Sequence, residues 1–223
     1  MNDEQHAPVP ADRPGVDRQG TPVEGDPALP PGGAAPGTAE VLDFWFGPPP
    51  LQSRPSWFRK DPDFDAQIRA RFGALIERAL DGTWPAGWGG EAADDLARVL
   101  VLDQFTRNVF RASARAFAGD AQALTLALGL VDAGRDRQLP ALQRWFVYLP
   151  LEHAEDLAMQ DRSVGLFDEL AREHPELAGA LDYAQRHREV IARFGRFPHR
   201  NDWLGRTSTE AERAYLAQPG SGF

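Results

Sequence analysis

The chain of 223 residues contains no cysteine. This absence excludes a disulfide framework and a thiolate zinc site. Lysine is nearly absent as well, because Lys60 stands alone beside 23 arginines, a bias that either genomic composition or function could produce. The formal charge is −9. So acidic a balance argues against nucleic acid as a partner, since neutralising phosphates requires a basic face.

Long apolar runs are also missing. No stretch approaches the ~20 apolar residues that a membrane span requires. The N-terminus starts with the polar residues Asn2, Asp3 and Glu4, and no apolar core follows, so it does not resemble a signal peptide. We therefore expect a cytoplasmic protein that has no membrane partner.

The N-terminal part of the chain differs in composition from the rest. Residues 1–38 hold eight prolines, six glycines and no aromatic residue, with six acidic side chains against two basic ones. A segment so poor in apolar surface cannot offset the entropy cost of ordering it. We predict a disordered tail over residues 1–37, most simply a solvated extension rather than a partner-binding arm, and an all-helical domain over 38–223.

The rest of the chain is patterned as helices. Apolar residues recur at three- and four-residue spacing, and no segment shows the alternation of a strand. Expected helices cover about 38–46, 61–81, 92–111, 119–133, 140–149, 151–172, 177–194 and 209–216. We predict an all-α fold of antiparallel helix pairs joined by short connections.

Helix boundaries follow from the capping residues. Thr38 can cap the first helix, and Asp61 before a proline is typical of a helix start. Thr209 and Glu212 have the spacing of a capping box. Pro150 is expected to break or kink the helix before it, so that a separate long helix follows.

The first candidate site lies in the expected helix 92–111. One arc of about 140° on that helix carries polar side chains that suit directed hydrogen bonds. They are Asp103, Gln104, Arg107, Asn108 and Arg111. Solvated helix faces usually carry Glu and Lys instead. Two interpretations stay open: a solvated face with an Asp103–Arg107 ion pair, or side chains that belong to a functional site or a buried hydrogen-bond network.

The second candidate follows Pro150. Glu152, Asp156 and Gln160 would stack one turn apart on the expected helix, with His153 beside them. Carboxylates next to a histidine can form a general acid/base group, which makes His153, Glu152 and Asp156 catalytic candidates. The alternative is that first-turn acids complement the helix dipole. The paired-histidine zinc motif is missing, so we expect no metal site.

The third candidate is the loop 193–206, which carries four arginines, one histidine and a single acid. Arginine presents a rigid fork of donors that suits carboxylate or phosphate groups. The anion-binding candidates here are Arg196, Arg200, Asn201 and Arg206, with His199 as a second residue that could carry a proton. The structural alternative is that these arginines clamp the acids at 103, 152, 155 and 156.

Four motifs then occur in order along the chain. They are VLDFWFG at 41–47, LDQFTRNVFR at 102–111, YLPLEHAED at 148–156, and RFGRFPHRN at 193–201 followed by LGR at 204–206. Together they resemble the bacterial domain of unknown function 924 family over about residues 39–223. Thr106 and Ala154 stand where that pattern has proline and serine, and neither removes a candidate site group.

The resemblance implies an all-helical fold similar to tetratricopeptide-repeat domains, a right-handed helical array in one domain. It implies no activity.

Two functions from different classes follow from the residues. The first is an enzyme or binding protein for a small anionic molecule, either a carboxylate or a phosphate. In it the arginines hold the anion, and His153 or His199 moves a proton, oriented by Glu152 or Asp156. The full set of arginines is Arg107, Arg111, Arg196, Arg200 and Arg206. The alternative is an interaction module whose concave helical surface binds a peptide or partner protein. We expect no cofactor and predict no particular oligomeric state.

Overall fold

The computed structural model describes residues 36–221, and within them every regular element is a helix. The all-α prediction is therefore confirmed, whereas the predicted tail falls outside the described residues apart from positions 36 and 37. The α-helices are α1 (Thr38–Phe46), α2 (Pro62–Leu80), α3 (Ala92–Val99), α4 (Thr106–Val109), α5 (Asp120–Asp132), α6 (Ala141–Glu152), α7 (Leu157–Glu173), α8 (Ala178–Phe194) and α9 (Glu210–Leu216).

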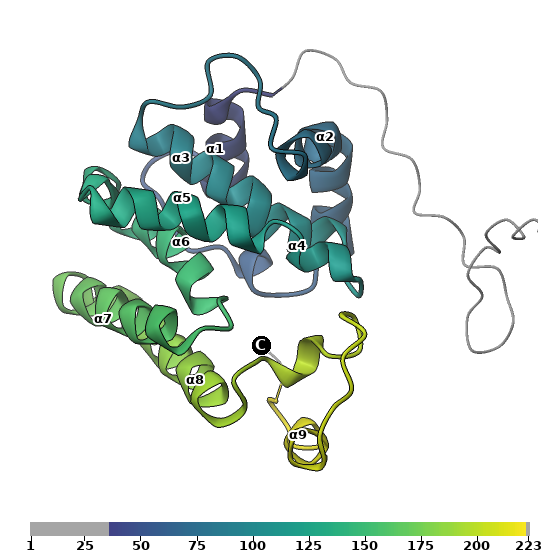
Figure 1. Cartoon of the computed structure of the whole chain (residues 1–223). Helices are drawn as coiled ribbons and strands as arrows, with labels where there is room; N and C mark the ends of the chain where they lie inside the picture. The colour runs from purple at the N-terminus through teal and green to yellow at the C-terminus, as the bar shows by residue number, and fades with distance from the viewer. Residues whose placement is uncertain (1–35, 222–223) are drawn as a thin grey trace, which may run out of the picture.

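Figure 1 shows α1 to α6 gathered in one part of the molecule, with α7 and α8 side by side beneath them. Helix α6 packs on α7 and so joins the two parts. The α7–α8 pair, joined by a short connection, is compatible with a tetratricopeptide-like arrangement.

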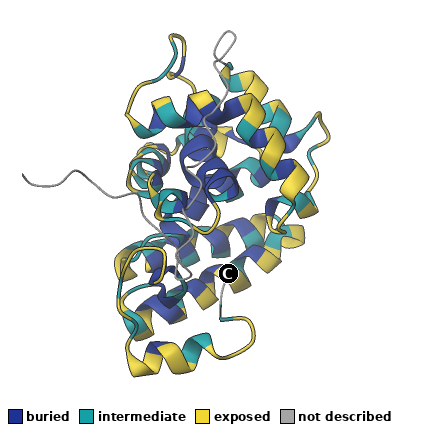
Figure 2. Ribbon diagram, turned by 90° about the vertical axis from the view of Figure 1, so that its right-hand side faces the viewer, coloured by how far each residue is buried: buried dark blue, intermediate teal, exposed yellow. Residues whose placement is uncertain are grey.

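Helices α3, α5 and α6 pack on one another. Figure 2 shows that the buried residues, in dark blue, lie in the interior between the packed helices. The largest fully buried side chains include Trp45, Phe72, Phe105, Phe146, Tyr148 and Phe167. Phe197 belongs to a smaller cluster with Val190 and Ile191, which anchors the C-terminal segment (residues 195–221) to α8. No helix among residues 36–221 is long and apolar enough to cross a membrane.

Local capping chemistry sets several helix ends as predicted. Asp61 accepts hydrogen bonds from two backbone N–H groups in the first turn of α2, at 3.1 and 3.0 Å. Thr209 and Glu212 form the predicted capping box at the start of α9. The prediction that Thr38 caps the first helix is wrong, because Gly37 is the N-cap residue of α1 and Thr38 is the first residue of the helix.

The segment predicted as one helix from 92 to 111 changes its winding in the middle. Residues Leu100–Phe105 form a π-helix between α3 and α4. The hydroxyl of Thr106 donates to the carbonyl of Leu102 at 2.8 Å. A π-helical turn is wider than an α-helical one, so the arc predicted for the polar side chains does not hold. Such turns are frequent at functional sites.

The boundary between α6 and α7 also differs from the prediction. Helix α6 continues through Pro150 and ends at Glu152, and α7 begins only at Leu157. Asp156 is the cap of α7, where its side chain accepts a hydrogen bond at 3.0 Å. The predicted stack of Glu152, Asp156 and Gln160 on one helix is therefore wrong, because a loop separates Glu152 from α7.

Candidate functional site

Asp103 lies at the centre of a buried polar cluster. Its carboxyl has no exposed surface, and its Oδ1 atom lies 2.7 Å from Nδ1 of His153. Nε2 of Gln104 donates to Oδ2 at 2.6 Å, and Nη1 of Arg107 lies 3.0 Å from Oδ1. Burial by itself would raise the pKa of Asp103, but Arg107 and His153 outweigh it and hold the pKa below its usual range. The carboxyl is therefore ionised.

His153 is the C-terminal cap residue of α6, and 15% of its side chain is exposed. Burial and the nearby Arg107 lower the pKa of His153, against the opposite effect of Asp103. A neutral imidazole beside an ionised carboxylate carries its proton on Nδ1 and donates it to Oδ1. The lone pair is then on Nε2, which is the arrangement of a histidine general base.

Arg107 links this pair to a second carboxylate. Its Nη1 and Nη2 atoms donate to the two oxygens of Asp120 at 2.8 and 3.0 Å. Nη1 of Arg200, from the C-terminal segment, lies 3.3 Å from Oδ2 of the same carboxyl. We call Asp103, Arg107, Asp120, His153 and Arg200 the Asp103–His153 cluster.

A glycine brings Asp120 into this cluster. Gly119 precedes α5, and a Cβ atom at this position would lie 2.2 Å from the backbone carbonyl oxygen of Leu102 in the π-helix. Any side chain would push α5 away from the π-helix, because the obstacle is backbone. Glycine therefore permits the close approach that places Asp120 beside Arg107.

Arg200 is the least compensated cation of the cluster. Its guanidinium carbon lies 4.8 Å from the ring centroid of Phe117 and 4.5 Å from that of Phe197. Only 7% of the side chain is exposed, and its Nε atom has no hydrogen-bond partner among residues 36–221. Burial, together with the positive charge of Arg107, lowers the pKa of Arg200 to about 10.

A second histidine–carboxylate pair lies next to the first. Nδ1 of His187 in α8 lies 3.0 Å from Oε1 of Glu152 and 2.9 Å from the carbonyl oxygen of Tyr183. The rings of His153 and His187 have centroids 6.2 Å apart. Glu152 was predicted to orient His153, but it pairs with His187 instead. His199 lies nearby, and burial and Arg200 lower its pKa to about 3.

Arg206 and Asn201, in the loop 193–206, take part in hydrogen bonds that hold the C-terminal segment against the end of α6. Glu155 accepts hydrogen bonds from Nη1 and Nη2 of Arg206 at 2.5 and 2.9 Å and from the backbone N–H of Phe197 at 2.8 Å. Burial opposes ionisation, but these bonds lower the pKa of Glu155. Nε of Arg206 also donates to Asn201 at 3.0 Å. Of the four acids that the structural interpretation assigned to the loop arginines, Glu155 has such a partner in Arg206, whereas Asp103 contacts His153, Glu152 contacts His187 and Asp156 caps α7.

Other predicted site residues lie outside the cluster. Asn108 and Arg111 both bond to Asp65 on α2, at 2.7 Å for the amide and 2.5 and 3.0 Å for the guanidinium. Arg196 pairs with Glu212 on α9, at 2.6 and 2.9 Å. The predicted residues that the structure does bring together are Asp103, Gln104, Arg107, His153, His199 and Arg200.

Sequence reasoning missed Asp120 and His187, and it missed the two rings that enclose Arg200. Asp120 follows Gly119 at the start of a helix, where an acidic residue has a simple explanation in the helix dipole. His187 lies on an amphipathic helix, which is typical of a core histidine. Neither position carries a local signal. Within residues 36–221, no group of three or more potential ligands is arranged to hold a metal ion.

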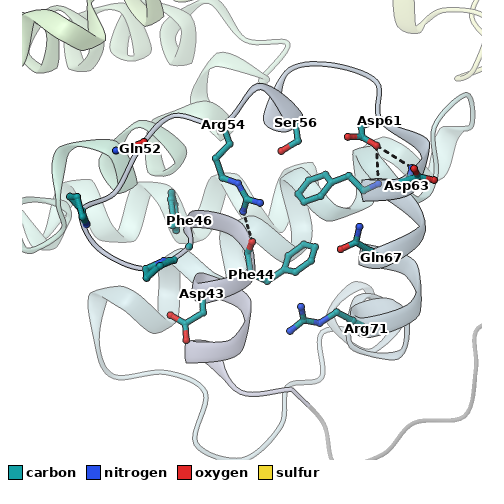
Figure 3. Close-up of a pocket in the computed structure, with 14 residues that line it drawn as sticks. Asp43, Phe44, Phe46, Gln52, Arg54, Ser56, Asp61, Asp63, Gln67 and Arg71 are labelled. Carbon is teal, nitrogen blue, oxygen red and sulfur yellow. Dashed lines mark hydrogen bonds between the residues drawn. The ribbon is translucent and has the colours of Figure 1, made fainter.

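An open pocket of about 770 Å³ lies elsewhere, between α1, the loop after it and the start of α2 (Figure 3). Phe44, Phe46 and Phe64 contribute aromatic surface to it, and Nη1 of Arg54 donates to the backbone carbonyl of Phe44 at 2.7 Å. None of the predicted site residues lines this pocket. Its size therefore gives no support to the Asp103–His153 cluster.

The family described as "Bacterial protein of unknown function (DUF924)" matches residues 41–220. The chain belongs to this family. It is 38% identical to the protein of unknown function ATU0120 from Agrobacterium tumefaciens, whose solved structure superposes with a TM-score of 0.69 over 81% of this chain and 96% of that chain. No curated protein matches the chain. Family membership thus agrees with the all-helical fold and names no activity.

Proposed function

We propose that this DUF924 chain is an enzyme that acts on a small anionic substrate by proton transfer. His153 is the general base that accepts the proton. The observation that carries the proposal is the 2.7 Å contact between Nδ1 of His153 and the fully buried carboxyl of Asp103. This contact orients the imidazole and leaves Nε2 as the proton acceptor.

The electrostatics of the pair suit proton transfer. A base is effective only while it is unprotonated, and the lowered pKa of His153 keeps its ring neutral at pH 7. When Nε2 accepts a proton from the substrate or from a water molecule, the imidazolium that forms lies against an ionised carboxylate. Asp103 thus stabilises the charge that the reaction creates, without taking the proton itself.

Two arginines of the same cluster support an anionic substrate. Arg107 is shared between Asp103 and Asp120, whereas the one ion pair of Arg200 with a carboxylate among residues 36–221 is the 3.3 Å contact to Asp120. A buried guanidinium with so few hydrogen bonds gains from an additional anion. Partial exposure of His153 and Asp120, at 15% and 23% of their side chains, provides access from solvent.

The experiment is a thermal-shift screen of the full chain against carboxylates and phosphate monoesters, followed by ¹H NMR of each compound that raises the melting temperature. We expect wild type to convert at least one of these compounds. His153→Gln should still bind it but convert it about 100-fold more slowly or worse, because general-base catalysis contributes that much. His174→Gln, at an exposed histidine, is the matched control and should convert like wild type.

Two results would contradict the proposal. In the first, no compound shifts the melting temperature, and His153→Gln only destabilises the protein, as expected of a structural network. In the second, compounds are converted equally by wild type and His153→Gln. Binding of peptides from an array, without binding of small anions, would instead support the interaction-module alternative.

A further inference from the structure

Arg200 has hydrogen-bonding capacity that the protein leaves unused. Its side chain is more than nine-tenths buried, and within the described part of the chain its one contact to a carboxylate, from Nη1 to Asp120, measures 3.3 Å. The Nε atom is buried without a hydrogen-bond partner among residues 36–221. An unpaired donor on a buried cation is costly, so a ligand atom that accepts from Nε would recover this cost on binding.

The surroundings of Arg200 restrict the direction from which an acceptor can approach. The rings of Phe117 and Phe197 lie within 4.8 and 4.5 Å of its guanidinium carbon. Because these rings occupy space beside the guanidinium, we expect an additional polar group to reach it along the N–H edge that the rings leave open. A planar carboxylate matches such an edge, since it accepts two parallel N–H bonds from one guanidinium.

The charges of the cluster favour a singly charged ligand. Asp103 and Asp120 are opposed by Arg107 and Arg200, so these four charges cancel while His153 is neutral. A site with no net charge does not offset the larger cost of removing a phosphate monoester from water, because that group carries about −1.5 to −2 at pH 7 and a monocarboxylate carries −1. When His153 takes up a proton from the ligand or from a water molecule, the ring gains one positive charge and the proton donor one negative charge, so the net charge of the site with its ligand does not change.

We infer that the anion bound at this site is a monocarboxylate, held at the edge of the Arg200 guanidinium through Nε. This inference rests on the proposed function for the location of the site, and it adds the chemical class of the substrate. Arg200 is then a substrate-binding residue, and Phe117 and Phe197 are positioning residues that fix the plane of its fork.

The test uses matched probes on the full chain. Propionate and benzoate are the monocarboxylates, propionamide and benzamide are their neutral isosteres, and ethyl phosphate and phenyl phosphate are the doubly charged analogues. Dissociation constants are measured by NMR titration at constant ionic strength and pH 7. We expect the carboxylates to bind about tenfold or more tightly than both the amides and the phosphates, as expected for a hydrogen-bonded charged contact.

Arg200→Lys keeps the positive charge but removes the planar fork. It should weaken binding of propionate and benzoate about tenfold or more, whereas Arg188→Lys, at an exposed arginine paired with Asp161, should leave binding unchanged. If Arg200→Lys fails to fold, the Nε–H signal of Arg200 in ¹⁵N-arginine wild type gives the same answer. That signal should move on adding propionate and stay in place on adding propionamide.

The inference would be overturned if the phosphates bound more tightly than the carboxylates, if the amides bound as tightly as the carboxylates, or if neither carboxylate bound. It would also be overturned if the Nε–H signal of Arg200 did not shift on adding propionate. These outcomes do not depend on catalysis. His153→Gln separates the two ideas, because it should retain carboxylate binding. If a carboxylate binds through Arg200 and is converted equally by wild type and His153→Gln, the proposed function fails and the carboxylate site stands.

Discussion

Asp103 and His153 are fifty positions apart in the chain, yet Oδ1 of one lies 2.7 Å from Nδ1 of the other. The contact joins the π-helix to the C-terminal end of α6. Arg107 extends it, since this guanidinium lies against the carboxylates of both Asp103 and Asp120. A substitution of Asp103 should therefore change both the free energy of unfolding and the pKa of His153.

Asp103→Asn should lower the free energy of unfolding by about 2–4 kcal/mol, because Arg107 loses one of its two carboxylates inside the protein. Urea unfolding at pH 7 measures this change. Asp168→Asn is the control, since Asp168 forms an exposed i,i+4 pair with Arg172. Its effect should stay within about 0.5 kcal/mol. Similar losses in both variants would show that the Asp103 contacts contribute little.

Asp103→Asn should also lower the pKa of His153 below its value in the wild type. Asp103 raises the proton affinity of the ring, whereas burial and Arg107 lower it, and the substitution removes the raising contribution. Titration of the ¹⁵N-histidine signals by NMR measures the change. An increase in the pKa of His153 would mean that Asp103 does not act on the ring as the geometry indicates.

His199 should make stability depend on pH below neutrality. Its pKa falls from an ordinary 6.5 to about 3 in the folded protein. As the pH drops below 6.5, His199 therefore becomes protonated in the unfolded chain but stays neutral in the folded chain. The free energy of unfolding then decreases by at most about 1.4 kcal/mol per pH unit. Above pH 7 the residue contributes no pH dependence.

The measurement compares wild type with His199→Gln in urea unfolding from pH 7.5 to 4. The stability of wild type relative to the variant should be constant above pH 7 and should decline steadily as the pH falls from 6.5. Parallel curves for wild type and His199→Gln would refute the assigned burial effect.

Gly119→Ala should destabilise the protein by about 1–3 kcal/mol, because the new Cβ would collide with the Leu102 carbonyl oxygen at 2.2 Å. Gly129→Ala within α5 is the control, since nothing lies within 4 Å of a Cβ placed there. It should instead stabilise by about 0.5–1 kcal/mol through helix propensity. Thermal unfolding measures the stability of both variants. An unchanged stability of Gly119→Ala would contradict the close approach of residue 119 to the Leu102 carbonyl.

The bond between Glu155 and Arg206 should hold the C-terminal segment in place. A double-mutant cycle of Glu155→Ala and Arg206→Ala should give a coupling energy of about 1–3 kcal/mol, as for contacting groups that share partly buried hydrogen bonds. The exposed pair Asp161–Arg188 should couple by about 0.5 kcal/mol or less. Limited proteolysis should cut the C-terminal segment faster in either Glu155 or Arg206 variant. Equal coupling in both pairs would contradict the clamp.

Local sequence signals were sufficient to place most of the helix ends. Asp61 and the Thr209–Glu212 box act through backbone groups within three residues, so their effect can be read from neighbouring letters. Pro150 misled the prediction, since α6 continues through it to Glu152. A proline removes one hydrogen bond, but the packing of a buried helix can compensate for that loss.

The candidate site was only partly predictable. Asp103, Arg107 and His153 were singled out because their residue types suit directed hydrogen bonds and proton transfer. Their partners could not be assigned in the same way. The carboxylate that Arg107 shares with Arg200 comes from Asp120, and Glu152 pairs with His187 rather than with its neighbour in sequence.

The sequence by itself determined the all-helical class, most helix limits, the family and the arginine-rich loop, because periodicity, capping and motifs act over a few neighbouring residues. Only the tertiary structure showed which carboxylate pairs with which arginine or histidine. Asn108 and Arg111 follow Arg107 closely in the chain, yet they bond to Asp65 on α2 and leave the cluster. That choice depends on the wider turn of the π-helix and on the packing of α2 and α5 against it, which no local pattern encodes.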